Sequence, residues 1–137
     1  MTLTTIKNDL LSRMLALLGN IPSAEVSHEN APFIPPVGLA DSEFFAGYTF
    51  LWGENIKASV GANARYRQTG MFVVQLVGRA GAGDGLLLEK VDALLALRGT
   101  TTTNGVVVTT GTPGNLVIAK GWANQSVSFN FYGDTVT

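Results

Sequence analysis

The sequence predicts an α+β fold: a single mixed or antiparallel sheet, two main helices packed on it, and a long N-terminal proline-rich arm. Three observations lead to this prediction. Two segments repeat apolar residues at helical spacing, several others have the alternation or the β-branched and aromatic content of strands, and a proline-rich stretch without periodicity precedes the first strand. A chain of 137 residues has the size of one ordinary domain, so residues 1–137 are assigned to a single domain.

A first helix is predicted over residues 4–18. Five apolar residues recur there at the spacing of one helical face: Ile6, Leu10, Met14, Leu17 and Leu18. Thr4 or Thr5 is the expected N-cap, and Gly19 is placed to end the helix.

Residues 19–43 are predicted to form an arm or loop. This segment has no apolar periodicity and contains four prolines: Pro22, Pro32, Pro35 and Pro36. Such an arm either reaches a neighbouring subunit or packs on its own domain, and both alternatives stay open.

Two strands are predicted over residues 44–52 and 65–78. The first is aromatic and β-prone, and a turn at residues 53–55 ends it; residues 56–61 then pair with it or form a loop. In the second strand, Phe72, Val74 and Leu76 share one face, while Met71, Val73 and Val77 share the other. Because both faces are apolar, we expect this strand to be covered on both sides and to lie in the middle of the sheet.

A second helix is predicted over residues 84–98, after a glycine-rich loop at residues 78–85. Asp84 is its expected N-cap, and Gly99 is placed to end it. Its buried stripe consists of Leu87, Leu88, Val91, Leu94 and Leu95.

Three further strands are predicted over residues 105–109, 115–120 and 122–132. The turn signal Thr112-Pro113-Gly114 separates the first two. In the last strand Val127, Phe129 and Phe131 point one way, and Ser126, Ser128 and Asn130 point the other. This alternation is typical of a half-buried antiparallel strand.

The chain is poor in charge: 14% of its residues are charged, against roughly 25% in an average soluble domain. Residues 99–119 contain no charged side chain. Because exposed sheet edges are usually kept soluble by charges, this stretch indicates a surface that neighbouring subunits cover. The alternative is a β-protein whose Thr and Asn side chains face water.

Composition excludes several classes of protein. With a net charge of -1 and a pI near 5.7, the chain lacks the clustered Lys and Arg of a nucleic-acid-binding protein. It has no cysteine, which excludes disulfides, thiolate metal sites and cysteine nucleophiles. Neither a signal peptide nor a membrane span is expected, because no apolar stretch has the required length and continuity.

No group of residues has the spacing of a catalytic, cofactor or metal site. The glycine loop at residues 78–85 lacks a phosphate-binding motif, and Asp84 would repel a phosphate there. The single histidine, His28, is interpreted as a surface residue. Two carboxylate pairs are better explained as solvated surface: Asp41 with Glu43, and Glu89 with Asp92. We therefore expect no enzymatic activity and no cofactor.

Arg65 and Arg67 alternate at the start of the strand 65–78, so they are expected to project from one face. Arg79 lies at the far end of the same strand. These arginines either contact acidic residues of a neighbouring subunit, line the lumen of a ring, or act as solvated charges that discourage unwanted strand pairing.

Four features of the chain, taken together, carry a resemblance. They are Asn30-Ala31-Pro32-Phe33-Ile34-Pro35-Pro36, then Arg65-Tyr66-Arg67-Gln68-Thr69-Gly70-Met71-Phe72-Val73-Val74-Gln75-Leu76, then an Ala-Gly-rich turn into an Ala/Leu helix, and finally Gly121-Trp122. In this order they resemble the tail-terminator (tail-completion) proteins of long-tailed bacteriophages. The resemblance covers nearly the whole chain. The neutral stretch 99–119 departs from the family, whose members carry more charge in the second half.

The resemblance implies a structural subunit that forms a ring, expected to be a hexamer, with copies of itself. The ring would dock on the last ring of the tail-tube protein, end its polymerisation, and provide the joint to the head-proximal connector protein. DNA would pass through the lumen without specific binding. The implied location is the head-proximal end of the virion tail, after assembly in the host cytoplasm.

On this interpretation six residues are expected at the interface with another subunit, the tube or the connector: Phe33, Glu54, Lys57, Arg65, Arg67 and Arg79. The arm and residues 53–64 are the expected contact regions. The alternatives are another ring protein, such as a head-tail connector or a tail-tube subunit, and then a small ligand-binding domain or a nucleic-acid module.

Overall fold

The computed structural model describes residues 1–19, 26–28, 43–57, 65–81 and 85–136. Most of the predicted arm 19–43, Asp84 and the whole segment 58–64 therefore lie outside the described residues. Within the arm, residues 26–27 form a short strand, so the prediction of a segment without secondary structure is wrong there. The described elements are α1 (Leu3–Leu17), β1 (Val26–Ser27), β2 (Phe44–Lys57), β3 (Arg65–Arg79), α2 (Gly85–Leu95), β4 (Val107–Ala119) and β5 (Trp122–Val136).

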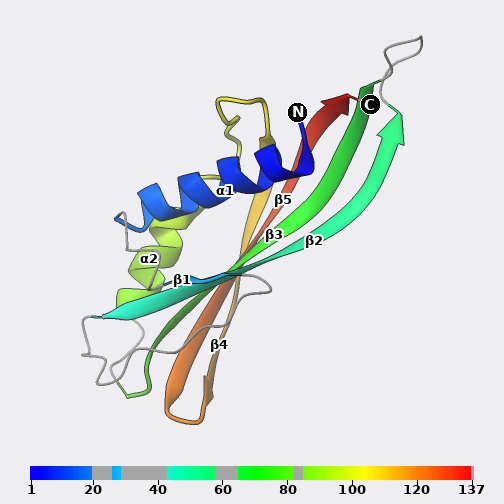
Figure 1. Ribbon diagram of the computed structural model, residues 1–137. Helices are drawn as coiled ribbons and strands as arrows, with labels where there is room; N and C mark the ends of the chain where they lie inside the picture. Colours follow the sequence, from blue (N-terminus) through cyan, green and yellow to red (C-terminus); the bar gives the residue numbers. More distant parts are fainter. Residues whose placement is uncertain (20–25, 29–42, 58–64, 82–84, 137) are drawn as a thin grey trace.

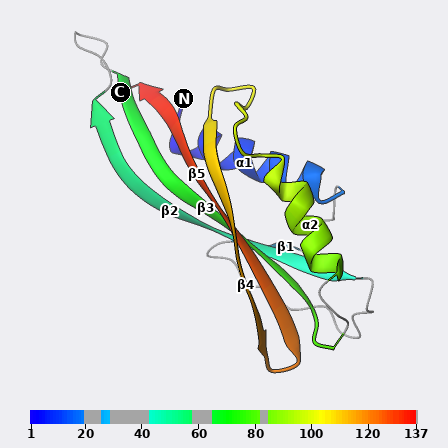
Figure 2. The same cartoon turned by 180° about the vertical axis from the view of Figure 1, so that it is seen from behind.

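The five strands form one sheet in the order β1-β2-β3-β5-β4. β1 runs parallel to β2, whereas all the other neighbouring pairs are antiparallel. The sheet is long and strongly twisted, and both helices lie on the same side of it (Figures 1 and 2). The α+β class and the mixed sheet are thus confirmed.

β3 lies in the middle of the sheet, as its apolar sequence predicts. It pairs with β5 along its whole length, from Arg65 opposite Val136 to Arg79 opposite Trp122, and with β2 on its other side. Side chains alternate along a strand, so one set of its residues faces the helices and the other faces away.

The core lies between the helices and this inner face. Buried residues of both helices belong to one cluster with those of the strands: Ile6, Leu10 and Met14 from α1, Leu87, Val91 and Leu94 from α2, and Phe72, Val74, Leu76, Val127, Phe129 and Phe131 from β3 and β5. Burial of this apolar surface is the main stabilising term.

The opposite face of β3 is only half covered. Met71, Val73 and Val77 are partly exposed, whereas Phe72, Val74 and Leu76 are fully buried. The expectation that the strand is covered on both sides is therefore met fully on one face and only in part on the other, because both described helices lie on the same face.

Helix α1 begins earlier than predicted. Its N-cap is Thr2, whose hydroxyl accepts a hydrogen bond from the backbone N–H of Thr5 at 3.2 Å, so the assignment of Thr4 or Thr5 is wrong. The predicted end is correct: Gly19 has a φ of 88°, a left-handed conformation that glycine adopts without strain. Helix α2 ends at Leu95, and the residues up to Arg98 continue as tighter turns, with Leu97 N–H bonded to the Leu94 carbonyl at 2.9 Å.

Two predicted turns are bulges inside continuous strands. β2 runs through residues 53–55 with a register shift between Trp52 and Asn55, and β4 runs through residues 112–114 with a shift between Pro113 and Leu116. β4 is therefore one strand, not the two predicted. Proline is tolerated at this place because β4 is the edge strand, where a missing N–H removes no ladder bond on the outer side.

Each bulge is held by a buried glutamine from the neighbouring strand. Gln68 of β3 donates its Nε2 to the Gly53 carbonyl at 3.0 Å, and its Oε1 accepts from Asn55 Nδ2 at 2.9 Å. Gln125 of β5 likewise donates to the Gly114 carbonyl. The carbonyl that each bulge takes out of the strand-to-strand hydrogen bonding thus keeps a hydrogen-bond donor. This allows β2 and β4 to continue as strands beyond the bulges.

β4 and β5 are joined by a tight two-residue turn. Lys120 and Gly121 have φ values of 52° and 82°, and Ala119 pairs with Trp122 across the turn. Two consecutive positive φ angles fit the type I′ turn that matches the twist of a hairpin. The turn holds the far half of β4 in register beside β5.

We predict that replacing Gln68 by leucine destabilises the protein by about 1–3 kcal/mol, because the bulge in β2 loses its hydrogen-bond partner. The matched control is Gln75→Leu, an exposed glutamine on the same strand, which should change the free energy of unfolding by less than about 0.5 kcal/mol. Urea denaturation measures both. If both substitutions change the free energy of unfolding by the same amount, Gln68 does not hold the bulge in β2.

Candidate assembly surfaces

Four of the predicted interface residues lie at one end of the sheet. Ile56 is opposite Arg67 and Lys57 is opposite Tyr66, so the end of β2 with Glu54 and Lys57 lies beside the start of β3 with Arg65 and Arg67. Arg79 is not part of this group. Because a strand rises about 3.3 Å per residue, the 15 residues of β3 hold it on the order of 45 Å from Arg65.

Arg67 is paired within its own chain. Its Nε donates to Asp134 Oδ1 at 3.0 Å, and its guanidinium lies 4.3 Å from the centre of the Tyr132 ring. The hydrogen bond to Asp134, and then the charge of that carboxylate, raise the pKa of Arg67 above its usual value. Arg67 and Asp134 come from neighbouring strands and remain partly exposed, so they form a polar surface at this end of the sheet.

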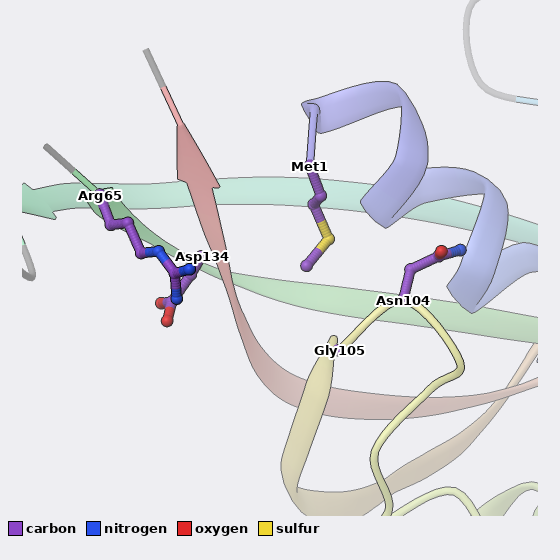
Figure 3. A pocket seen from close by; sticks show the side chains of 5 residues that line it. All are labelled: Met1, Arg65, Asn104, Gly105 and Asp134. Carbon is purple, nitrogen blue, oxygen red and sulfur yellow. The ribbon is translucent and has the colours of Figure 1, made fainter. Parts of the chain in front are cut away.

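Arg65 lines a small pocket beside this ion pair (Figure 3). The pocket has a volume of about 310 Å³, and its other lining residues are Met1, Asn104, Gly105 and Asp134. Arg65 and Asp134 thus share one pocket, and Asp134 also binds Arg67. Both arginines lie beside the same carboxylate, as expected of residues that alternate along one strand.

The interface roles of these residues stay predictions. Phe33, the sixth predicted residue, lies outside the described residues, as does most of the proline-rich arm. Glu54 and Lys57 are exposed at the end of β2.

The outer edge of β4 is a second surface, which the residue predictions missed. Leu116, Val117 and Ile118 are 38%, 58% and 64% exposed, and they are consecutive on a strand at the end of the sheet. From Thr109 onward no described residue pairs with the outer side of β4. An uncharged, apolar edge strand is a site where another chain can add a strand.

The outer edge of β2 is a third surface. β1 pairs with only two of its residues, Ala46 and Gly47, and no described strand pairs with the outer side of β2 beyond them. Leu51, Trp52 and Ile56 are 53%, 42% and 51% exposed. The Trp52 ring is held by stacking on Phe50, with 5.3 Å between the ring centres.

A shallow groove of about 520 Å³ crosses the face of the sheet near this edge. Its lining residues come from β2, β3, β5 and β4: Leu51, Gly53, Thr69, Gly70, Met71, Thr109, Asn130, Phe131 and Tyr132. The groove depends on Gly70, because a Cβ at this position would lie 2.7 Å from the Phe131 ring. It contains no charged side chain.

The two apolar edges belong to β2 and β4, which lie on opposite sides of the sheet order β1-β2-β3-β5-β4. The hairpin between β4 and β5 ends at the bottom of Figure 1, whereas β2 ends at the upper right, and Figure 2 shows the same separation. The sequence carries a signal for the first edge. Three large apolar residues in a row, between a bulge and a turn, do not fit a half-buried strand and indicate an exposed apolar run.

The described residues hold no group of histidines and carboxylates that could bind a metal ion. His28 is half-buried rather than a free surface residue, and its Nδ1 lies 3.1 Å from the Tyr48 hydroxyl. This hydrogen bond holds β1 beside β2. None of the helices in the described part of the chain has the length and apolar character needed to cross a membrane.

Comparison with known proteins shows the fold but no family. No protein-family model matches the chain, and no curated protein matches it. One solved structure, of no stated function, has a TM-score of 0.68 at 19% identity and covers 100% of this chain and 96% of its own. A chain of the virion of a native gene transfer agent particle has a TM-score of 0.54 at 16% identity, over 95% of each chain. At these identities the likeness shows a shared fold over nearly the whole chain.

We predict that Arg67→Ala lowers the midpoint of thermal unfolding by no more than a few degrees, because exposed ion pairs contribute little to stability. The difference from the unmodified protein should shrink further as sodium chloride is added, because salt screens exposed charges. Differential scanning calorimetry at low and high salt measures it. A large loss of stability that salt does not change would mean that this pair is structural and not a surface available for assembly.

Proposed function

We propose that this chain is a non-enzymatic structural subunit of a phage-like virion, and that it acts as a tail terminator. Copies of the chain form a ring, expected to be a hexamer, at the head-proximal end of the tail. The ring caps the tail tube, ends its polymerisation, and provides the joint to the connector.

The observation that carries this proposal is the pair of uncharged, apolar stretches on opposite edges of the sheet of one subunit. Leu116, Val117 and Ile118 on β4, and Leu51 and Trp52 on β2, are exposed without the charges that normally protect an edge strand. Two different edges that can each pair with another strand suit a head-to-tail contact between copies. Such a contact closes into a ring when the rotation between neighbouring copies adds up to a full turn.

Two further observations support a virion as the place of this assembly. The fold likeness to a chain of a gene transfer agent virion extends over 95% of both chains. The segments that resemble tail terminators include Arg65-Tyr66-Arg67 at the start of β3, where charged residues gather at one end of the sheet. Assembly through neutral edges leaves this charged end available for the tube or the connector.

DNA would pass through such a ring without being read. The net charge of -1 provides no excess of positive charge for binding phosphates. We therefore assign the protein a role in forming and closing the ring, not in recognising a DNA sequence.

The main alternative is another ring protein of the same particle, because open edges also permit a tail-tube subunit or a head-tail connector. These roles differ in where assembly stops. A tube subunit adds rings without limit, whereas a terminator adds one ring and presents a face that no further tube subunit binds.

The test is negative-stain electron microscopy of the purified protein, alone and with tail tubes of its own phage-like particle, over a range of concentrations. We expect single closed rings, and tubes that carry one such ring at one end and no longer elongate. Long tubes of this protein alone would show a tube subunit instead. Particles that neither close into rings nor bind tubes would contradict the proposal.

A further inference from the structure

The two open edges of the sheet have matched lengths. On β4 the outer edge is uninterrupted from Leu116, where the bulge after Pro113 ends, to Ala119, where the turn begins. On β2 no described residue pairs with the outer edge from Tyr48, after the last residue that β1 pairs with, to Trp52, where the register shift begins. Each edge therefore offers a regular stretch of four or five residues, bounded on both sides.

Both stretches lack the features that prevent strand pairing. Residues 116–119 are Leu-Val-Ile-Ala and residues 48–52 are Tyr-Thr-Phe-Leu-Trp, with no charge and no proline. The natural protections, proline and bulges, stand only at their borders, at Pro113 and at the bulge after Trp52. This arrangement confines any added strand to these two stretches and fixes its position.

From these matched edges we propose that residues 116–119 of one copy pair with residues 48–52 of the next copy, so that one sheet continues across the subunit boundary. The partner is a second copy because a single chain carries both complementary edges. Pairing of β4 with β4 would close at two copies and would leave Leu51 and Trp52 exposed. The head-to-tail contact covers both.

The pairing also predicts which side chains meet. Thr49 is opposite Val73 and Val117 is opposite Asn124, and all four belong to the face of the sheet that points away from the helices. In a continuous sheet with the helices of both copies on the same side, Thr49 and Val117 of adjacent copies therefore point to the same face, and the proposed register places them opposite each other. Ile118, the next residue, points to the other face.

Because the chain contains no cysteine, single cysteines report this contact without background. The experiment mixes Thr49→Cys protein with a size-tagged Val117→Cys protein under mild oxidation, at a concentration that gives rings. Mixed disulfide dimers should form several-fold more than when Thr49→Cys is mixed with Ile118→Cys, whose side chain faces away. Equal yields, or a predominance of dimers between two Val117→Cys chains, would overturn the pairing.

A second measurement does not depend on disulfide geometry. Val117→Lys places a charge on the proposed edge, whereas the control Thr112→Lys places the same charge on the same strand before Pro113, at another exposed position. Circular dichroism should show both proteins folded. Sedimentation should show that Val117→Lys shifts assembly to concentrations at least several-fold higher, and that Thr112→Lys does not. The same shift for both variants would contradict the proposal.

This inference deepens the proposed function, and the two can fail separately. If the unmodified protein forms rings that cap tubes while the cysteine pairs show no preference, the edge pairing is wrong and the terminator role stands. If the cysteine preference appears in open polymers that never close, the edge pairing stands and the terminator role is wrong.

Discussion

The pairing of β3 with β2 on one side and with β5 on the other is the interaction on which the rest of the structure depends. β3 is bonded to β5 from its first residue to its last, and its inner face carries Phe72, Val74 and Leu76 into the core. The helices can bury their apolar stripes only because this long central strand presents a continuous apolar face. The same length explains why the ends of the sheet reach beyond the helices and stay exposed.

Placing β3 at the centre leaves β4 and the far part of β2 at the rims. Their hydrogen-bonding groups face outward, and the usual protection of an edge by charge is missing from residues 48–52 and 109–119. Stability and assembly are therefore separated within the fold: the centre of the sheet holds the subunit together, and the rims remain for other chains. The paired charges of Arg67 and Asp134 provide a different, polar surface at one end.

Much of the fold can be predicted from the sequence, because α1, α2, β3 and β5 have the periodicity of their elements. The bulges could not be predicted locally. Residues 53–55 and 112–114 have the composition of turns, and hydrogen bonds from distant side chains, above all Gln68 to Gly53 and Gln125 to Gly114, help to keep the strands continuous. Charge drew attention to Arg65 and Arg67 and to the neutral stretch 99–119, but how far residues such as Leu116 are exposed within that stretch depends on where the helices stop.

Hydrogen exchange of the backbone amides, compared between dilute subunits and assembled protein, tests the account most directly. The account predicts that amides in residues 48–52 and 116–119 gain protection together on assembly, whereas those in the middle of β3 are already protected and do not change. If both edges exchange as fast in the assembly as in the free subunit, the sheet rims are not the assembly surfaces and the central claim is contradicted.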